Sequence, residues 1–538
     1  MLHRIHSTIF ALLFLVVFIG NTFVLRQESV GTLLLVLYMA FYGWELGGVI
    51  TQAEKAILRW WLGVWVLLSS VMILLTASYY IWKVTPEVIY VTILLTPPIL
   101  LWACRKATHL SLFSHAHDLW HSRRHHILRT VWIAISAIML LMSLFFFTLA
   151  QHPVVDAVRS VWERLPVSVF VLFILACALL FGLLTRGKER AISLLLFCVF
   201  LFSFLSVAAI VFPIGFGFDS FIHKATELHL AEFGTITPKP FYYIGQYVLV
   251  LFLHHGFLIP IDLADTFLVP TLTALLLPAA WFFAAAHITR KRSIAMMSLM
   301  GLFLLPLFSF IVTTPQALAN LWTLLLVLSS IPYLLEKEHP RLRVLCVSAI
   351  ATVLIHPIAG IPGLLYFMFL ATDPSRTNPR TPKTNRVVRT LLIVMACVIL
   401  PLSFVVNALM SKQQLGVNLA ALNPLTWLSQ LNLNVFFENK FSPLLDLVYL
   451  YGLNATLLLI ILSIFAWNEY RKDLSHRFRA ILLTVMALSV NYFIMSTALE
   501  FSFLIDYERT NYAARLLPLV TFFLTPYVIL GLGHVFMN

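Results

Sequence analysis

Long apolar stretches alternate with short polar connections along the whole of this 538-residue chain. An α-helix rises about 1.5 Å per residue, so a stretch of about 20 apolar residues crosses the hydrocarbon core of a bilayer. The pattern therefore predicts an all-α fold, a polytopic transmembrane helical bundle. The predicted spans, about 16 in number, lie at residues 7–25, 31–51, 60–82, 86–104, 130–150, 166–185, 191–212, 264–288, 294–313, 317–335, 343–356, 358–371, 388–410, 444–467, 480–497 and 514–534.

Composition supports a membrane protein. Apolar residues make up 61% of the chain and charged residues only 11%, against roughly 25% charged residues in soluble domains. The first stretch, Ser7 to Leu25, follows a basic start as a signal peptide does. It lacks a small-residue cleavage site and many further spans follow, so we expect a retained helix.

The positions of the basic residues predict the orientation of the chain. The net charge is +13, but Lys and Arg are concentrated in the connections that become cytoplasmic when the N-terminus starts inside. This is the distribution that the positive-inside rule describes. Both termini are then cytoplasmic, and the positive charge gives no reason to expect a nucleic acid partner.

Two stretches need special treatment for this alternation to hold. Residues 243–261 are apolar, yet counting them as a crossing would place a basic connection outside. We expect a helix that lies at the outer interface, or a re-entrant one, with Tyr242, Tyr243 and Tyr247 at headgroup depth. Conversely, residues 343–371 must cross twice, with a break at His356-Pro357.

The predicted organisation has two parts. Residues 1–189 form an N-terminal transmembrane module of about six spans, and residues 190–538 form a transmembrane core. The polar segment 213–242 of this core is then an extracytoplasmic loop, followed by the helix at 243–261. In a chain with so few charges, this loop is the best candidate for chemistry in water.

A short helix is predicted inside the loop, from Phe218 to Phe233, because Gly234 is a good left-handed terminator. Asp219 and His223 are four residues apart, and Glu227 follows one turn later, so the three side chains share roughly one face. A carboxylate at the edge of a bilayer can have its pKa adjusted for general-base work. Asp219 could instead cap the N-terminus of the helix.

The loop resembles the GT-C superfamily of membrane glycosyltransferases. The resemblance rests on an acidic residue at the head of a short helix, a glycine turn, a proline-aromatic segment and a following span that ends in a basic connection. In this chain those pieces are Phe218–His223, Gly234, Pro238–Tyr243 and His287–Arg292. Two further pieces, Ile355–Pro362 and Tyr507–Pro518, are similar to a helical break and a last span of that family. The chain differs from the family in having no paired acidic dipeptide and in carrying Asp262 and Asp265 where a basic residue often stands.

This resemblance implies transfer of a sugar from a polyprenyl-phosphate carrier on the extracytoplasmic face. Asp219 matches the family's acidic residue, which acts as base or orients the acceptor. The acceptor is a glycan, a lipid or a protein, and the sequence does not choose among them. The remaining candidates are Glu227 and His223 as neighbours of Asp219, with Arg509, Arg515, His356, Lys239, Lys224 and Tyr243 on the substrate or its phosphate.

Other interpretations remain open at this stage. Arg509 and Arg515 could anchor the chain at lipid headgroups. The spacing of Asp219 and His223 is compatible with a divalent cation, which is weak evidence by itself. The protein as a whole could be a transporter or lipid flippase, or a non-catalytic membrane scaffold. We see no internal repeat and few charges in mid-span, which argues against coupled transport.

Overall fold

The computed structural model describes residues 2–51, 56–103, 129–158, 160–186, 190–336, 341–373, 382–412, 414–418, 421–422, 443–474, 476–501 and 511–537. Helices dominate these residues, and the strands among them are the antiparallel pair β1 (Gly416–Val417) and β2 (Leu499–Glu500). Eleven of the described helices are long and apolar enough to cross a membrane. The prediction of an all-α, polytopic membrane protein is confirmed at this level.

Two compact units make up the chain, and their boundary differs from the predicted one at residue 190. The first unit contains Met1–Phe283 and Phe308–Leu321, and the second contains Ala284–Leu307 and Trp322–Asn538. The first unit extends beyond residue 189 because the helices that follow pack onto the N-terminal ones. The helix at Ile244–Phe257, for example, contacts the second, third and fourth helices of the chain.

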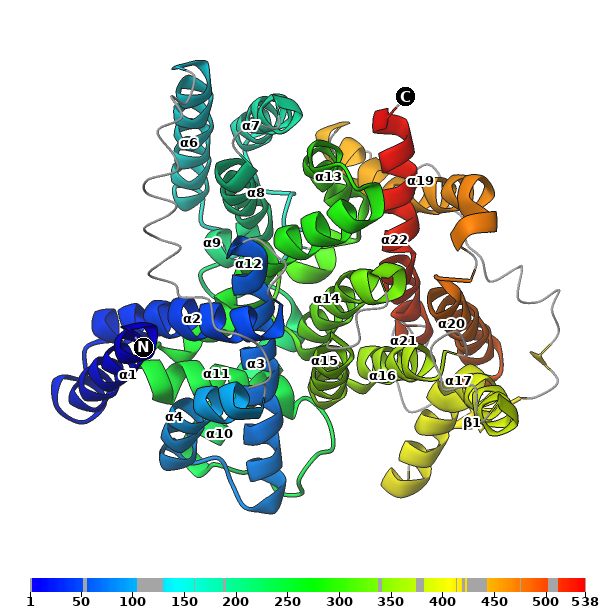
Figure 1. Ribbon diagram of the computed structural model, residues 1–538, viewed down its shortest axis with the longest axis horizontal. Helices are drawn as coiled ribbons and strands as arrows, with labels where there is room; N and C mark the ends of the chain where they lie inside the picture. Colours follow the sequence, from blue (N-terminus) through cyan, green and yellow to red (C-terminus); the bar gives the residue numbers. More distant parts are fainter. Residues whose placement is uncertain are drawn as a thin grey trace. The chain divides into compact units, whose positions relative to one another are not determined.

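The first unit holds the predicted N-terminal spans and the polar loop (Figure 1). Residue Ser206 divides the predicted span 191–212 into two helices. In chain order the elements are α1 (Leu2–Gly20), η1 (Asn21–Leu25), α2 (Glu28–Ile50), α3 (Ala56–Ile81), α4 (Pro86–Ala103), α6 (Arg129–Ala150), α7 (Val167–Arg186), α8 (Arg190–Leu205), α9 (Val207–Val211), α10 (Phe218–Phe233), α11 (Ile244–Phe257) and the first part of α12 (Ile261–Thr289).

Glycines bring α2 and α3 into close contact. A Cβ added at Gly63 of α3 would overlap the carbonyl oxygen of Gly43, and one added at Gly47 would overlap the carbonyl oxygen of Arg59. Lipid tails are as apolar as leucine side chains, so helices in a membrane associate through close packing instead of through exclusion of water. Small residues therefore set the distance between these two helices.

The rest of the chain, which forms the second unit except for Phe308–Leu321, follows the remaining predicted spans with one departure. The stretch predicted as a single span at 294–313 is not one helix, and Pro306, which lacks the N–H that a continuing helix needs, separates its last two turns. It consists of α13 (Arg292–Met297) and the 3₁₀ turns η2 (Ser298–Leu304) and η3 (Leu307–Phe310). The helices after it are α14 (Pro315–Glu336), α15 (Arg341–Ile355), α16 (Pro357–Ala371), α17 (Pro382–Ser411), α19 (Pro443–Leu474), α20 (Arg479–Thr497), α21 (Asn511–Ala514) and α22 (Leu516–Met537).

The break predicted at His356-Pro357 is confirmed. α15 ends at Ile355 and α16 begins at Pro357, a residue whose fixed φ suits the first position of a helix. The N–H of Ile358 donates to His356 Nδ1 over 3.1 Å, so this side chain caps α16. Gly360 then lets α16 approach α15, since a Cβ there would overlap the backbone of Val353.

The contact between α2 and α3 yields a stability prediction. We expect Gly63→Ala to destabilise the protein by about 2–3 kcal/mol, because overpacking forces the two helices apart. Gly48→Ala, on the same pair of helices, is the matched control: its added Cβ meets nothing within 4 Å, and alanine favours a helix by up to about 1 kcal/mol. Thermal unfolding in detergent measures both variants, and equal unfolding temperatures would contradict the prediction.

Candidate functional site

The predicted helix of the polar loop is confirmed as α10. It runs from Phe218 to Phe233 and ends at Gly234, whose φ of 71° is left-handed. The residue before the helix is Gly217, which gives no side-chain cap. Asp219 lies in the first turn with an exposed side chain and is not the N-cap residue.

One face of α10 packs against α11 through polar contacts. Gln246 Nε2 donates to Glu227 Oε1 over 3.1 Å, and both side chains are fully buried. One turn earlier, His223 Nδ1 and the hydroxyl of Tyr247 share a hydrogen bond of 2.8 Å. The i, i+4 spacing of His223 and Glu227 therefore places both on the face that meets α11.

A second carboxyl group faces Glu227 from the first turns of α12. Asp265 is buried, and it interacts with Glu227 both through charge and through a side-chain hydrogen bond. Glu227 Oε2 and Asp265 Oδ1 are buried and receive no hydrogen bond from a donor elsewhere in the protein. Two neighbouring buried carboxyl groups disfavour a state in which both are ionised, so the pair favours retention of a proton by one of them.

Burial makes Glu227 the member that retains a proton most readily. Burial raises the pKa of Glu227 well above its usual range, and the negative charge of Asp265 raises it further. The hydrogen bond from Gln246 and the charge of Lys224 act in the opposite direction. Glu227 therefore holds a proton at pH values at which an ordinary glutamate is ionised.

Lys224 brings positive charge to the same place. It lies one turn before Glu227 on α10 and forms an ion pair with Asp262 of α12, and its charge acts on both Glu227 and Asp265. The Asp262 side chain remains 72% exposed, so this ion pair is held at the surface. The site thus contains one cation and three carboxyl groups.

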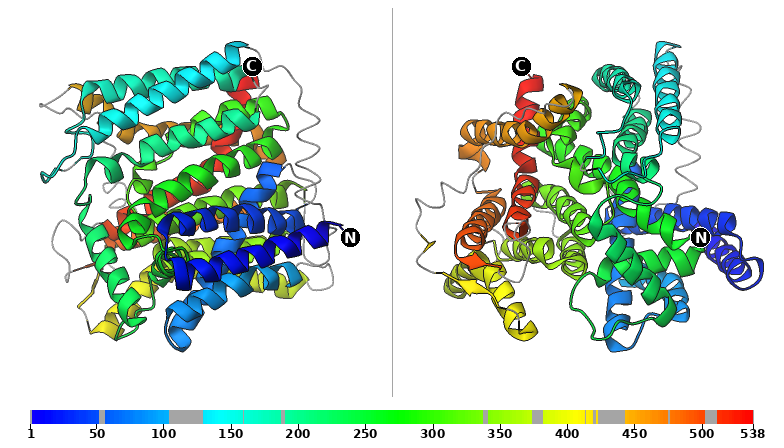
Figure 2. Two further views of the ribbon diagram at one scale, coloured as in Figure 1. Left: turned by 90° about the vertical axis from the view of Figure 1, so that its left-hand side faces the viewer. Right: turned by 180° about the vertical axis from the view of Figure 1, so that it is seen from behind.

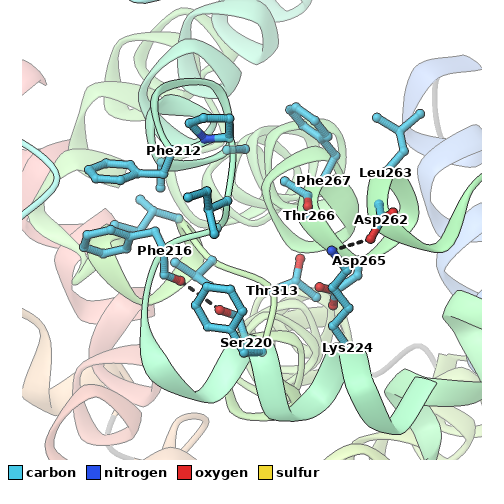
Figure 3. Close-up of a pocket in the computed structure, with 18 of the residues that line it drawn as sticks. Phe212, Phe216, Ser220, Lys224, Asp262, Leu263, Asp265, Thr266, Phe267 and Thr313 are labelled. Atoms are coloured by element: carbon cyan, nitrogen blue, oxygen red, sulfur yellow. Dashed lines mark hydrogen bonds and ion pairs between the residues drawn. The ribbon is translucent and has the colours of Figure 1, made fainter. Parts of the chain in front are cut away.

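Lys224, Asp262 and Asp265 line a cavity of about 430 Å³ in the first unit. Figure 3 shows Lys224, Asp262 and Asp265 on one side of it and the rings of Phe212 and Phe216 on the other. Ser220 is held at its edge by a hydrogen bond of 2.9 Å to the carbonyl of Phe216. Sites for small molecules commonly have about this volume and combine apolar walls with a few converging polar groups.

A second cavity adjoins the first and is almost entirely apolar. It measures about 490 Å³ and lies among α2, α3, α11 and α12. Leu263 and Phe267 of α12 line both cavities, so these two side chains separate a charged space from an apolar one. An amphipathic molecule could place its polar end in the first cavity and its apolar chain in the second.

Three sequence candidates in the first unit have other surroundings. Asp219 is exposed and is not among the residues that line the charged cavity. Lys239 donates to the carbonyls of Tyr79 and Trp82 over 2.7 and 2.8 Å, so it caps the end of α3 and is not directed at a phosphate site. Tyr243 has a φ of 73°, starts α11 and places its ring edge-on to His223.

The remaining candidates belong to the second unit or lie outside the described residues. His356 is buried and caps α16. Arg515 is half-buried, with its guanidinium 5.2 Å from the ring centre of Tyr512. Arg509 lies outside the described residues.

The helix predicted at 243–261 is more deeply enclosed than an interfacial helix. α11 spans Ile244–Phe257, and Tyr247, expected at headgroup depth, is 4% exposed. Helices α2, α3, α4 and α10 surround it. A helix on a membrane surface keeps one face toward water, so this enclosure favours the re-entrant alternative.

Sequence reasoning missed the partner of Glu227 across the site. Asp265 drew notice only as an acidic residue where a basic one was expected. Its distance of 38 positions from Glu227 gives no periodic signal that would connect the two. A carboxylate in the first turns of a long apolar helix is nevertheless a rare and costly feature, and that signal could have identified it.

No group of three or more His, Cys, Asp or Glu side chains suited to a metal ion occurs among the described residues. Searches of protein-family models, curated proteins and solved structures find no match to this chain. The class that fold and sequence define is therefore a polytopic helical membrane protein.

Substituting the buried glutamate should change how stability depends on pH. Because the folded-state pKa of Glu227 is raised, its contribution to stability is complete below the unfolded value near 4.5 and declines as pH rises above it. Glu227→Gln keeps the acceptor for Gln246 and cannot ionise. We expect the unfolding temperature of this variant to fall less than that of the wild type between roughly pH 5 and pH 8.

Glu232→Gln is the control, since Glu232 lies on the same helix with an exposed side chain. Its pH profile should parallel that of the wild type. Identical pH profiles for Glu227→Gln and the wild type would contradict the role assigned to the buried glutamate.

Proposed function

We propose that this protein is an integral membrane glycosyltransferase that moves a sugar from a polyprenyl-phosphate carrier to an acceptor hydroxyl. The reaction would take place in the charged cavity between α10 and α12. The observation that carries the proposal is the buried carboxyl pair Glu227–Asp265 beside Lys224, next to an apolar cavity. Together these supply a proton acceptor, a cation and a place for a lipid chain.

In the proposed step, Asp265, Lys224 and Glu227 each have one role. Asp265, which lines the cavity, accepts the proton of the acceptor hydroxyl while that oxygen attacks the anomeric carbon of the sugar. The bond from that carbon to the phosphate oxygen breaks, and polyprenyl phosphate leaves with both electrons. Lys224 stabilises the charge on the phosphate. Glu227 retains its own proton and its hydrogen bond to Asp265, and so positions the base.

The proposed topology follows from the basic connections. We propose about 16 crossings with both termini cytoplasmic, a GT-C-like core over 190–538 and the cavity on the extracytoplasmic side. The apolar helices described above support the crossings, and the orientation rests on the distribution of Lys and Arg. A cysteine at exposed Glu232 should then react with an impermeant thiol reagent from the outside.

Substitution at the cavity tests the chemistry. We expect Asp265→Asn to lower sugar transfer in isolated membranes by about 10²–10⁴-fold, the usual contribution of a general base. Asp219→Asn should lower it less than tenfold, because that side chain does not line the cavity. The assay follows transfer of labelled sugar from the polyprenyl carrier, normalised to the amount of protein in the membrane.

Two results would oppose this assignment. If Asp265→Asn transferred sugar as fast as the wild type, Asp265 would not be the general base. A large loss with Asp219→Asn alone would instead return the role to the residue that the family resemblance indicates. Glu232→Gln controls for general effects of removing a carboxylate from α10.

A proton-coupled transporter is a second candidate, and one observation favours it. Ionisable residues inside membrane proteins often form proton relays, and the Glu227–Asp265 pair holds a proton at the start of a candidate span. Purified protein in liposomes would distinguish the two candidates. Substrate-driven proton uptake that Asp265→Asn abolishes, without sugar transfer by the wild type, would favour transport.

A further inference from the structure

Arg389 is a buried arginine whose guanidinium is incompletely paired. It lies near the start of α17, inside the second unit, and is 6% exposed. Its Nε and Nη1 atoms are buried and donate no hydrogen bond. A buried arginine normally has each N–H satisfied, so these two donors indicate a ligand that completes the site.

α20 lies beside α17 (Figures 1 and 2). Asn491 of α20 donates to the carbonyl of Ala396 over 2.7 Å and accepts from the N–H of Leu400 over 3.2 Å. Farther along, the rings of Phe404 and Phe501 are 5.3 Å apart. Residue numbers therefore rise together along the two neighbouring segments.

This register places Arg479 level with Arg389. Arg479 is twelve residues before Asn491, or roughly 18 Å along the helix axis, and Arg389 is seven residues before Ala396, or roughly 10 Å. The difference of roughly 8 Å can be spanned when the two long arginine side chains extend toward one another. The charges that act on Arg389 agree with this, since they are those of Arg479 and Asp373.

The N-terminus of α20 adds donors at the same level. α20 is 19 residues long, and the preceding residue, Phe478, offers no side-chain cap. The first N–H groups of a helix have no partner within the helix, and the helix dipole adds partial positive charge there. Two arginines at one end of two parallel helices repel each other unless an anion lies between them.

We propose that Arg389, Arg479 and the N-terminus of α20 bind a phosphate group. Arginine presents a planar fork that matches phosphate oxygens, and a helix N-terminus is a ready anion site. Both arginines lie at the starts of candidate spans, at the depth where phospholipid headgroups lie. The phosphate is that of an anionic phospholipid or a soluble phosphate, and the site is independent of the reaction proposed above.

The experiment uses the full chain, purified in a neutral detergent, and follows its thermal unfolding. Phosphatidylglycerol is titrated in one arm, diacylglycerol without a phosphate in the second, and inorganic phosphate in the third. We expect saturable stabilisation by phosphatidylglycerol and none by diacylglycerol. Arg389→Gln should raise the apparent Kd for phosphatidylglycerol about tenfold or more, because it removes charge-assisted hydrogen bonds.

Arg479→Gln should weaken binding similarly, and it keeps the test decisive if the buried Arg389 variant fails to fold, since Arg479 is exposed. Arg343→Gln is the matched control, an exposed arginine near the start of α15. Stabilisation by inorganic phosphate with the same dependence on Arg389 and Arg479 would support the site and identify a soluble anion. Equal stabilisation of the wild type, Arg479→Gln and Arg343→Gln by phosphatidylglycerol would overturn the proposal, as would no stabilisation by either phosphate source.

Discussion

The fully buried carboxyl group of Glu227 is the constraint on which the arrangement of the first unit depends. Burying an ionisable group without partners costs several kcal/mol, so α10 must meet groups that satisfy it. Gln246 of α11 supplies a hydrogen bond, and Asp265 of α12 supplies a second buried carboxyl group whose charge favours the protonated form of Glu227. These two contacts fix three helices against one another. The charged cavity exists because α10 is held in that position with Lys224 at its edge.

Within each unit, close backbone contacts and isolated polar contacts determine how neighbouring helices pack. Burial of apolar surface alone does not select one orientation of an apolar helix over another. Gly43, Gly47 and Gly63 set the approach of α2 to α3. In the second unit, Asn491 of α20 inserts between Ala396 and Leu400 of α17, just before Pro401 interrupts the hydrogen bonding of that helix. A helix that is apolar on all sides can rotate in a membrane at little cost. A few polar or glycine positions therefore determine its rotation and depth.

Local signals in the sequence predicted the parts of the fold that depend on local chemistry. The helix at 218–233 and its end at Gly234 follow from glycine's freedom at positive φ, and the break at His356 follows from the proline after it. The prediction of a single helix at 294–313 was wrong. The stretch is apolar enough for a span, but it consists of a short helix and two 3₁₀ turns, and Pro306 separates those turns. The enclosure of α11 was only partly foreseen, since hydropathy does not report which side of an apolar helix meets protein.

The candidate site was predictable only in part, because it depends on contacts between helices that are distant in the sequence. Spacing placed His223 and Glu227 on one face of α10, and that is where they lie. It could not identify which face turns inward, so Asp219 was preferred and is exposed. Asp265 and Gln246 join the site from separate helices. Lys239 was predicted to bind phosphate because of its charge. Its ammonium group instead donates to the carbonyls at the end of α3.

The contrast between Asp219 and Asp265 bears on where a general base belongs in this molecule. A carboxylate in water is stabilised as the anion and is a weak base, and the side chain of Asp219 is exposed. A carboxylate inside an apolar wall gains basicity, but it also loses its charge unless a neighbour holds the proton in its place. Glu227, more deeply buried than Asp265, is suited to hold that proton, which leaves Asp265 at the cavity as the acceptor. In the proposed reaction the pair would thus meet two demands that one carboxylate cannot meet alone, because Glu227 would retain a proton while Asp265 offers an ionised oxygen at the cavity.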